Sequence, residues 1–134
     1  MGRLSIVLAA GLLCAEAATP VRFNRDIRPI MSDTCFKCHG PDRRARMAGL
    51  RLDIREEALK KTKSGVTPIV PGDTETSAII QRIFAANAAK IMPPQYAHKE
   101  LTAAQKDTIR RWSEECHRCV HPGTSPARRP DAVA

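Results

Sequence analysis

The apolar residues of this chain fall into short stripes with helical spacing, and no useful stretch alternates apolar and polar residues as a strand does. The first stripe, at i, i+4, i+7 and i+8, consists of Phe23, Ile27, Ile30 and Met31. Pro29 lies inside this stripe, so we expect either one helix or two short turns. The segment leads directly into Cys35.

Two helices are expected in the middle of the chain. Asp53 and Glu56 have the spacing of a capping box, which predicts a short helix through residues 58–61. Asp73 or Thr74, after the Gly72 turn, is expected to cap a helix that runs to about residue 86. Its apolar stripe, which we assign to the core, consists of Ile79, Ile80, Ile83 and Phe84.

A proline-rich loop separates this helix from the last one. Two prolines directly follow Met92, and they predict a stiff, extended segment that can hold a thioether in a fixed direction. Thr102 and Gln105 then form a capping box for a final helix, with Ile109 and Trp112 on its inner face. The pattern as a whole predicts an all-α fold of short helices joined by Pro- and Gly-rich loops.

The N-terminus has the pattern of a secretion signal. Positive charge at Arg3, an apolar run over residues 4–13 and the Ala-x-Ala sequence at residues 15–17 predict a signal peptide over residues 1–18. The apolar run is short for a membrane span, although an uncleaved anchor and lipidation at Cys14 are alternatives. We therefore expect a periplasmic or otherwise exported protein with no membrane span after signal cleavage.

Length and charge limit the classes of function. A chain of 134 residues has room for one domain, here expected over residues 19–116, with one modest core. The net charge is +8, which suits either a solvated surface or a docking face for an acidic redox partner. Export and the few, scattered aromatic residues argue against nucleic acid as a partner.

The most specific motif is Cys-x-x-Cys-His at residues 35–39. In one helical turn the thiols of Cys35 and Cys38 lie on one face and can bond the two vinyl groups of a haem. His39 then directs its imidazole at the iron. The motif therefore predicts one covalent haem c, while a zinc knuckle or a disulfide would use the same cysteine spacing.

The second axial ligand is expected to be Met92. Met31 lies on the haem-bearing side just before Cys35, and Met47 follows His39 too closely to reach the opposite face easily. Met92 lies far downstream in its proline-stiffened loop and can cover that face. A buried core role for Met92 is one alternative, and His98 as the ligand is another.

Five blocks of the sequence, in this order, resemble the planctomycete-type cytochrome c domain. They are Phe23-Asn24-Arg25-Asp26-Ile27-Arg28-Pro29-Ile30, Cys35-Phe36-Lys37-Cys38-His39-Gly40-Pro41-Asp42, Gly49-Leu50-Arg51-Leu52-Asp53, Ile69-Val70-Pro71-Gly72-Asp73 and Met92-Pro93-Pro94. The resemblance covers roughly residues 21–113. It implies a class I-like cytochrome c fold with His39 as proximal ligand and Met92 as distal ligand. Members of the family often lie at the N-terminus of long exported proteins.

The tail departs from this family pattern. A second Cys-x-x-Cys pair, Cys116 and Cys119, has its histidine one residue too late for haem attachment. A disulfide between the two is the leading interpretation in an oxidising compartment, and a small metal site with His117 or His121 is an alternative. Residues 117–134 are expected to be a disordered C-terminal tail.

These patterns together predict an exported monohaem cytochrome that carries one electron and is not an enzyme, with unidentified donor and acceptor proteins. Basic residues such as Arg51 and Lys90 are candidates for pairing with the haem propionates, but no spacing selects one of them. One alternative is a haem protein with an open iron site for ligand sensing or catalysis. Others are an electron-entry module of a larger exported protein, and a zinc- or disulfide-stapled interaction module without haem.

Overall fold

The computed structural model describes residues 19–115, and every regular element in this range is helical. The elements are η1 (Phe23–Ile27), α1 (Arg28–Thr34), α2 (Arg55–Ala58), α3 (Ala78–Ile83), η2 (Gln95–Ala97) and α4 (Ala103–Glu115). The all-α fold is thus confirmed for the described residues. The predicted signal peptide (1–18), Cys116, Cys119 and the tail (117–134) lie outside them.

The first helical segment has two parts, as the position of Pro29 suggests. A π-helical turn, η1, passes directly into α1, and Pro29 occupies the first turn of α1, where a missing N–H costs least. Ile27 and Met31 have no solvent-exposed surface. The stripe read from the sequence is therefore the face that this segment turns toward the core.

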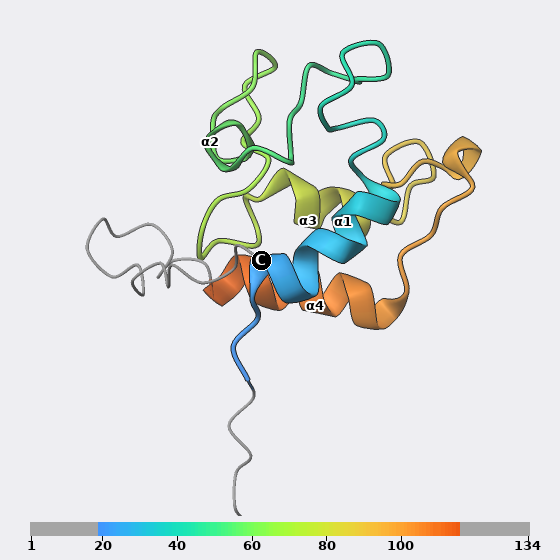
Figure 1. The fold of residues 1–134 in the computed structure, drawn as a ribbon. Coiled ribbons are helices and arrows are strands. Elements are labelled where there is room, and N and C mark those ends of the chain that lie inside the picture. The colour runs from blue at the N-terminus through green and yellow to red at the C-terminus, as the bar shows by residue number, and fades with distance from the viewer. Residues whose placement is uncertain (1–18, 116–134) are drawn as a thin grey trace, which may run out of the picture.

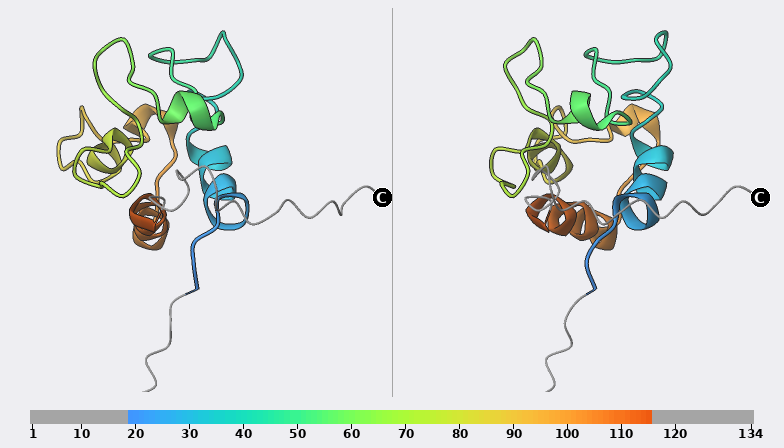
Figure 2. Two further views of the ribbon diagram at one scale, coloured as in Figure 1. Left: turned by 90° about the vertical axis from the view of Figure 1, so that its left-hand side faces the viewer. Right: turned by 60° about the vertical axis from the view of Figure 1, so that its left-hand side comes forward.

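The last helix, α4, begins at the predicted capping box. The backbone N–H of Thr102 donates to the Gln105 side chain at 2.9 Å, and the backbone N–H of Gln105 donates to the Thr102 hydroxyl at 3.2 Å. Trp112 stacks obliquely on Phe23 with ring centroids 5.5 Å apart. This pair joins α4 to η1, and the two elements lie side by side in both views of Figure 2.

The capping prediction at Asp53 is wrong. Helix α2 begins at Arg55 and ends at Ala58, three residues before the expected end, and no side chain caps it. The carboxylate of Asp53 instead accepts two hydrogen bonds from the guanidinium of Arg51, at 2.8 and 2.5 Å. The guanidinium two residues away competes successfully for this carboxylate, because it is charged and makes two parallel hydrogen bonds to it.

The helix expected after Gly72 is shorter than predicted at both ends. Asp73 accepts hydrogen bonds from the backbone N–H groups of Glu75 and Thr76, which close a turn, and α3 starts only at Ala78. It ends at Ile83, and Phe84 is half exposed, contrary to its assignment to the core. The other three apolar residues of the stripe, Ile79, Ile80 and Ile83, are buried.

Helices and loops occupy different sides of the molecule. Helices α1, α3 and α4 form the lower part in Figure 1, and the segments before and after α2 rise above them. The core residues are contributed by both sides: Ile27, Met31, Leu52, Ala58, Ile69, Ile79, Ile80, Ile83, Leu101, Ile109 and Trp112. None of the helices in residues 19–115 is long and apolar enough to span a membrane.

Candidate functional site

A largely apolar cavity lies between the helices and the loops above them. Four segments line it: the end of α1 with residues 35–39, the loop over residues 48–52, the stretch from Thr62 to Ile83, and the loop over residues 92–97. Cys35, Cys38, His39 and Met92 all belong to this lining. The structure therefore brings together all four residues that were predicted to hold a haem.

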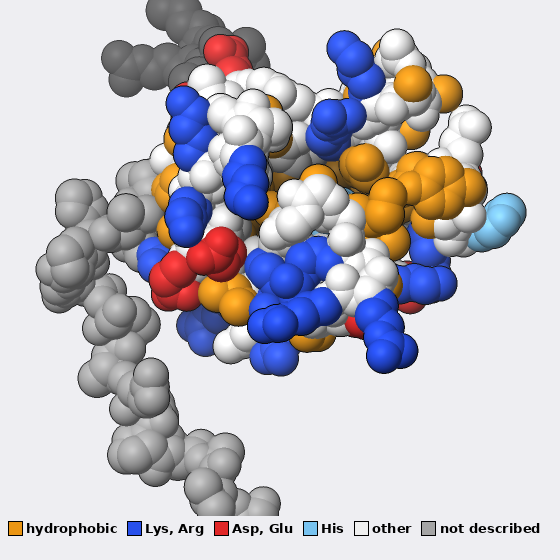
Figure 3. All heavy atoms as spheres, turned by 90° about the horizontal axis from the view of Figure 1, so that it is seen from above, with side chains coloured by type: hydrophobic (Ala, Val, Ile, Leu, Met, Phe, Trp, Pro, Cys, Tyr) orange, Lys and Arg blue, Asp and Glu red, His pale blue; other side chains and the backbone are white. Residues whose placement is uncertain are grey.

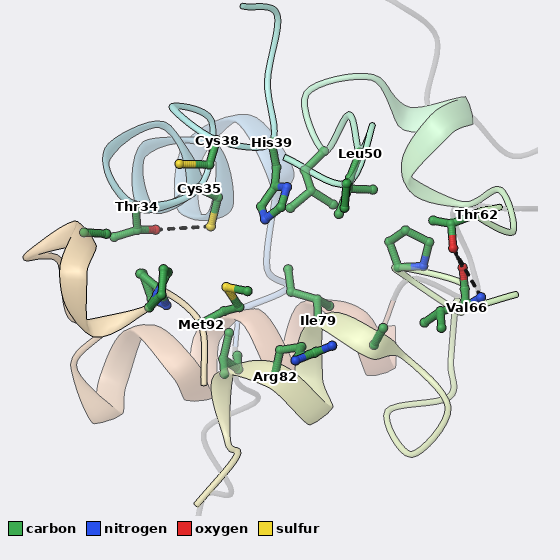
Figure 4. Close-up of a pocket in the computed structure, with 18 of the residues that line it drawn as sticks. Thr34, Cys35, Cys38, His39, Leu50, Thr62, Val66, Ile79, Arg82 and Met92 are labelled. Atoms are coloured by element: carbon green, nitrogen blue, oxygen red, sulfur yellow. Dashed lines mark hydrogen bonds between the residues drawn. The ribbon is translucent and has the colours of Figure 1, made fainter. Parts of the chain in front are cut away.

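The segment from Cys35 to His39 makes the helical turn that the motif requires. The backbone N–H of His39 donates to the carbonyl of Cys35 at 2.8 Å, and that of Cys35 donates to Met31 at the end of α1 at 2.8 Å. Figure 4 shows Cys35, Cys38 and His39 on one side of the cavity. Cys35 and Cys38 are not joined by a disulfide, and burial raises the pKa of the Cys35 thiol.

The loop after the motif anchors the backbone of His39. Its carbonyl accepts from Leu52 N–H at 2.9 Å, and the carbonyl of Cys38 accepts from Met47 N–H at 2.7 Å. Burial lowers the pKa of His39, so the neutral imidazole is favoured, which is the form that binds a metal. The backbone of Met47 has a smaller, opposite effect on this pKa. The Nδ1 atom of His39 is buried and makes no hydrogen bond with the described residues.

Met92 faces His39 from the opposite side of the cavity (Figure 4). Its backbone N–H donates to the carbonyl of Arg82 on α3 at 3.0 Å, and the peptide bond between Met92 and Pro93 is cis. Helix α3 therefore fixes the start of the loop that carries the thioether. Imidazole and thioether side chains approach the cavity from two different parts of the chain.

The other candidate ligands in the described residues do not line this cavity. Met31 is fully buried in the core, Met47 is half exposed, and His98 is exposed and borders a separate hollow that Met92 also lines. His117 and His121 lie outside the described residues. Met92 is thus the one predicted distal candidate that the structure places opposite His39.

Sequence reasoning missed the polar residues of the cavity. Arg82, Thr62 and Ser64 belong to its lining, whereas Arg51, which had been considered for the propionates, pairs with Asp53 and Lys90 does not reach the cavity. The signal for Arg82 was present in the spacing. It follows Ala78 by four residues and Ile79 by three, and both of these also line the cavity, so the spacing places Arg82 on their face of α3.

The donor set fits a haem better than a bare metal ion. Among the described residues, no group of three or more His, Cys, Asp or Glu side chains is arranged to hold a metal ion. Two thiols, a neutral imidazole and a thioether around an apolar cavity are instead what a covalently bound porphyrin requires. A helical fold around such a cavity defines the class of c-type haem proteins.

The family comparison agrees with this class. Residues 35–96 match the family described as Planctomycete cytochrome C, and this match supports a planctomycete-type cytochrome c domain in the chain. No curated protein and no solved structure matches the chain. The matched segment begins at Cys35 and includes Met92, so it contains all four predicted haem-binding residues. A cytochrome c domain implies a covalently bound haem c and electron transfer through it.

Proposed function

We propose that the chain is an exported monohaem cytochrome c that carries one electron between partner proteins. In this proposal Cys35 and Cys38 form the two thioether bonds, His39 is the proximal ligand and Met92 the distal ligand. The domain extends over residues 19–116 and has a class I-like fold. Residues 1–18 are removed during export, and the C-terminal Cys116 and Cys119 form a disulfide.

One observation carries the proposal: His39 and Met92 face each other across a cavity that also has Cys35 and Cys38 in its wall (Figure 4). Residues so far apart in the chain meet only through the tertiary fold. A bound haem supplies one-electron chemistry at its iron, and histidine–methionine ligation raises its reduction potential relative to two histidines. With both axial positions filled by side chains, no substrate can reach the iron.

The protein side chains hold the site and exclude water from it. Leu50, Leu52 and Ile79 supply apolar surface to the cavity, so that a low dielectric surrounds the iron and favours its less charged, reduced form. The turn at residues 35–39 and the Arg82 carbonyl hold the two ligands in place before haem arrives. Little rearrangement is then needed when one electron enters or leaves.

The surface charge supports an acidic protein as redox partner. The net charge is +8, and Lys and Arg side chains predominate on the face seen in Figure 3, where exposed hydrophobic side chains lie beside them. A cationic face of this kind accelerates encounter with an anionic partner, and this effect weakens as the salt concentration rises. Electron exchange with the native partner is therefore expected to slow at high ionic strength.

The test is coexpression of the full chain with a cytochrome c maturation system. We expect haem that stays attached on a denaturing gel, one haem per chain, and the weak far-red absorption band that methionine–iron ligation produces in oxidised cytochromes c. Mass spectrometry of the exported product would locate the cleavage site. A chain that carries no covalent haem under these conditions would refute the proposal.

One observation favours a second candidate, a haem protein with an open iron site. Met92 borders the haem cavity on one side and a separate hollow, lined also by Ile91, Pro93 and His98, on the other. A thioether with space behind it can swing away from the iron. Covalent haem without the far-red band, together with carbon monoxide binding to the reduced protein, would support this candidate instead.

A further inference from the structure

The two ends of the cavity differ in polarity: the Thr34 hydroxyl at the cysteine end already donates to the backbone of its own helix, whereas the charged side chain and two further hydroxyls lie away from the cysteines. In Figure 4, Cys35 and Cys38 lie at one end, whereas Thr62 lies at the other and Arg82 extends along the floor toward it. Arg82 is the single Lys, Arg, Asp or Glu side chain in the cavity lining as described. The cavity is thus asymmetric, with the thiols at one end and the positive charge directed toward the other.

A haem is asymmetric in the same way. The two vinyl groups that react with thiols lie on one edge of the porphyrin, and the two propionates lie on the opposite edge. Attachment at Cys35 and Cys38 therefore directs the propionates toward the end formed by Thr62, Ser64 and Arg82. A carboxylate that enters an apolar cavity is strongly disfavoured unless it meets a positive charge or hydrogen-bond donors.

The guanidinium of Arg82 has donors to offer. Its Nη1 donates to the backbone carbonyl of Lys90 at 3.2 Å, and the remaining N–H groups make no other hydrogen bond with the described residues. Arginine has five N–H donors in a planar fork that matches a carboxylate. One contact with Lys90 orients the fork and leaves donors for an anion.

The Thr62 and Ser64 hydroxyls complete this end. Their oxygens lie 2.9 Å apart. The Thr62 hydroxyl also donates to the backbone carbonyl of Val66 at 2.8 Å and accepts from the backbone N–H of Val66 at 3.2 Å. Because Thr62 donates its single proton to Val66, Ser64 is the donor in the bond between the two hydroxyls, and this proton can rotate to a propionate at the rim. The turn thus holds a hydroxyl donor at the rim of the cavity.

We propose that Arg82, with the Ser64 hydroxyl, is the propionate-binding site of this cytochrome and that Arg82 raises the reduction potential of the haem. The inference rests on the proposed function, because it requires covalent haem. A positive charge beside the haem disfavours the oxidised iron, which carries one more positive charge than the reduced iron. Removal of the charge is expected to lower the potential.

The experiment compares haem-loaded wild type with Arg82→Gln, Arg82→Lys and the control Arg28→Gln, which removes the same charge from an exposed position on α1 outside the cavity lining. In Arg82→Gln, the ratio of oxidised to reduced haem at the wild-type midpoint potential is expected to rise about three- to tenfold. At 59 mV per tenfold, this corresponds to a reduction potential lower by about 28 to 59 mV. Arg82→Lys should retain most of the wild-type potential, and Arg28→Gln should change the ratio less than about twofold.

The far-red band separates this role from a structural one. Arg82 also contacts Lys90, close to Met92, so a merely supporting side chain would lose the methionine band when replaced. The inference requires a shifted potential with the band intact. It is overturned if Arg82→Gln shifts no more than Arg28→Gln, or if the shift accompanies loss of the band.

A second measurement covers the case in which Arg82→Gln does not mature. Arg82→Lys keeps the charge but loses the planar fork, so the propionate bending mode in the resonance Raman spectrum should shift relative to wild type, and an unchanged mode would overturn the inference. Wild type without covalent haem would instead refute the proposed function. The two failures are therefore distinguishable.

Discussion

The two walls of the cavity are built in different ways. The His39 wall, residues 31–52, is held by hydrogen bonds within this one segment, from Cys35 to Met31, from His39 to Cys35 and from Leu52 to His39. The Met92 wall, residues 82–101, depends on its contact with α3 and on an ion pair between Lys99 and Asp33 on α1, 66 residues away. The first wall is held by hydrogen bonds within one segment of the chain, whereas the second also depends on an ion pair with the distant helix α1.

This difference predicts which ligand is held more firmly against local unfolding. A ligand on a locally hydrogen-bonded turn stays in place as long as the turn persists, whereas a loop held by long-range contacts can detach without global unfolding. We therefore expect His39 to determine whether haem binds at all, and Met92 to determine how it behaves. The predictions below test this contrast, from the largest expected effect to the smallest.

His39→Ala is expected to abolish covalent haem attachment. The imidazole is the only nitrogen ligand in the described cavity lining, and without it the iron has no proximal partner while the thioether bonds form. Haem staining of a denaturing gel after coexpression with the maturation system provides the measurement. Normal haem content in this variant would show that the His39 wall is less important than proposed.

Met92→Ala is expected to keep its covalent haem but lose the far-red band. The potential should fall and the reduced protein should bind carbon monoxide, because an axial position is open. Met47→Ala, at a half-exposed methionine outside the cavity lining, is the matched control and should retain the band. If the band persists in Met92→Ala, another side chain is the distal ligand.

Gly40→Ala is expected to lower the free energy of unfolding by about 3 kcal/mol. A Cβ at this buried position would lie 2.2 Å from the carbonyl oxygen of Phe36, within the turn that presents His39. Backbone would have to move to make room. Urea denaturation of the haem-loaded protein, followed by circular dichroism, measures the change.

Gly49→Ala is the matched control in the same wall. Its φ is +65°, which strains any residue with a Cβ, but no atom lies within 4 Å of the added carbon. We expect a cost of about 1 kcal/mol, from backbone conformation alone. Equal costs at Gly40 and Gly49 would contradict the close packing that the structure shows behind the motif.

Lys99→Gln is expected to loosen the Met92 wall selectively. The ion pair with Asp33 is exposed, so its contribution to global stability should be no more than about 1 kcal/mol. The far-red band should disappear at a lower urea concentration than the helical signal. Lys60→Gln, which breaks an exposed pair with Glu57 next to α2, should leave the two transitions unchanged relative to each other.

Asp26 is expected to contribute a small acid-dependent stability outside both walls. Hydrogen bonds from Arg25 and from the Arg22 N–H lower the pKa of Asp26 from 3.8 to about 2. The unfolded chain therefore binds the proton more readily, so this stability is complete above about pH 4 and is lost as the pH falls toward 2. Asp26→Asn should flatten the acid dependence of the urea midpoint in that window, and an unchanged dependence would contradict the role of Asp26.

Local signals in the sequence predicted elements well where the deciding contacts were local. The capping box at Thr102 and the division of the first helix at Pro29 follow from groups within a turn of each other. The predictions failed at Asp53 and Asp73, where a carboxylate had a choice of partners. Asp53 accepts from Arg51, and Asp73 accepts from the backbone N–H of Glu75 in a turn, so neither carboxylate caps a helix.

The residues of the site differ in the same way in how far the sequence predicted them. The motif at residues 35–39 specifies its own geometry, because thiols at i and i+3 and imidazole at i+4 share a face in any helical turn. That Met92 belongs opposite it was a hypothesis from the proline-stiffened loop and the family resemblance. Arg82 and Ser64 gave no sequence signal strong enough to select them from the many basic and hydroxyl residues.

The sequence by itself determined the helical class, the haem-attachment motif and the resemblance to the planctomycete-type cytochrome c domain. Only the tertiary structure decided which methionine faces His39 and which arginine enters the cavity. The physical reason is distance along the chain: hydrogen bonds within a turn are encoded by adjacent residues. The separation between His39, Met92 and Arg82 depends on how α1, α3 and α4 pack around a shared core.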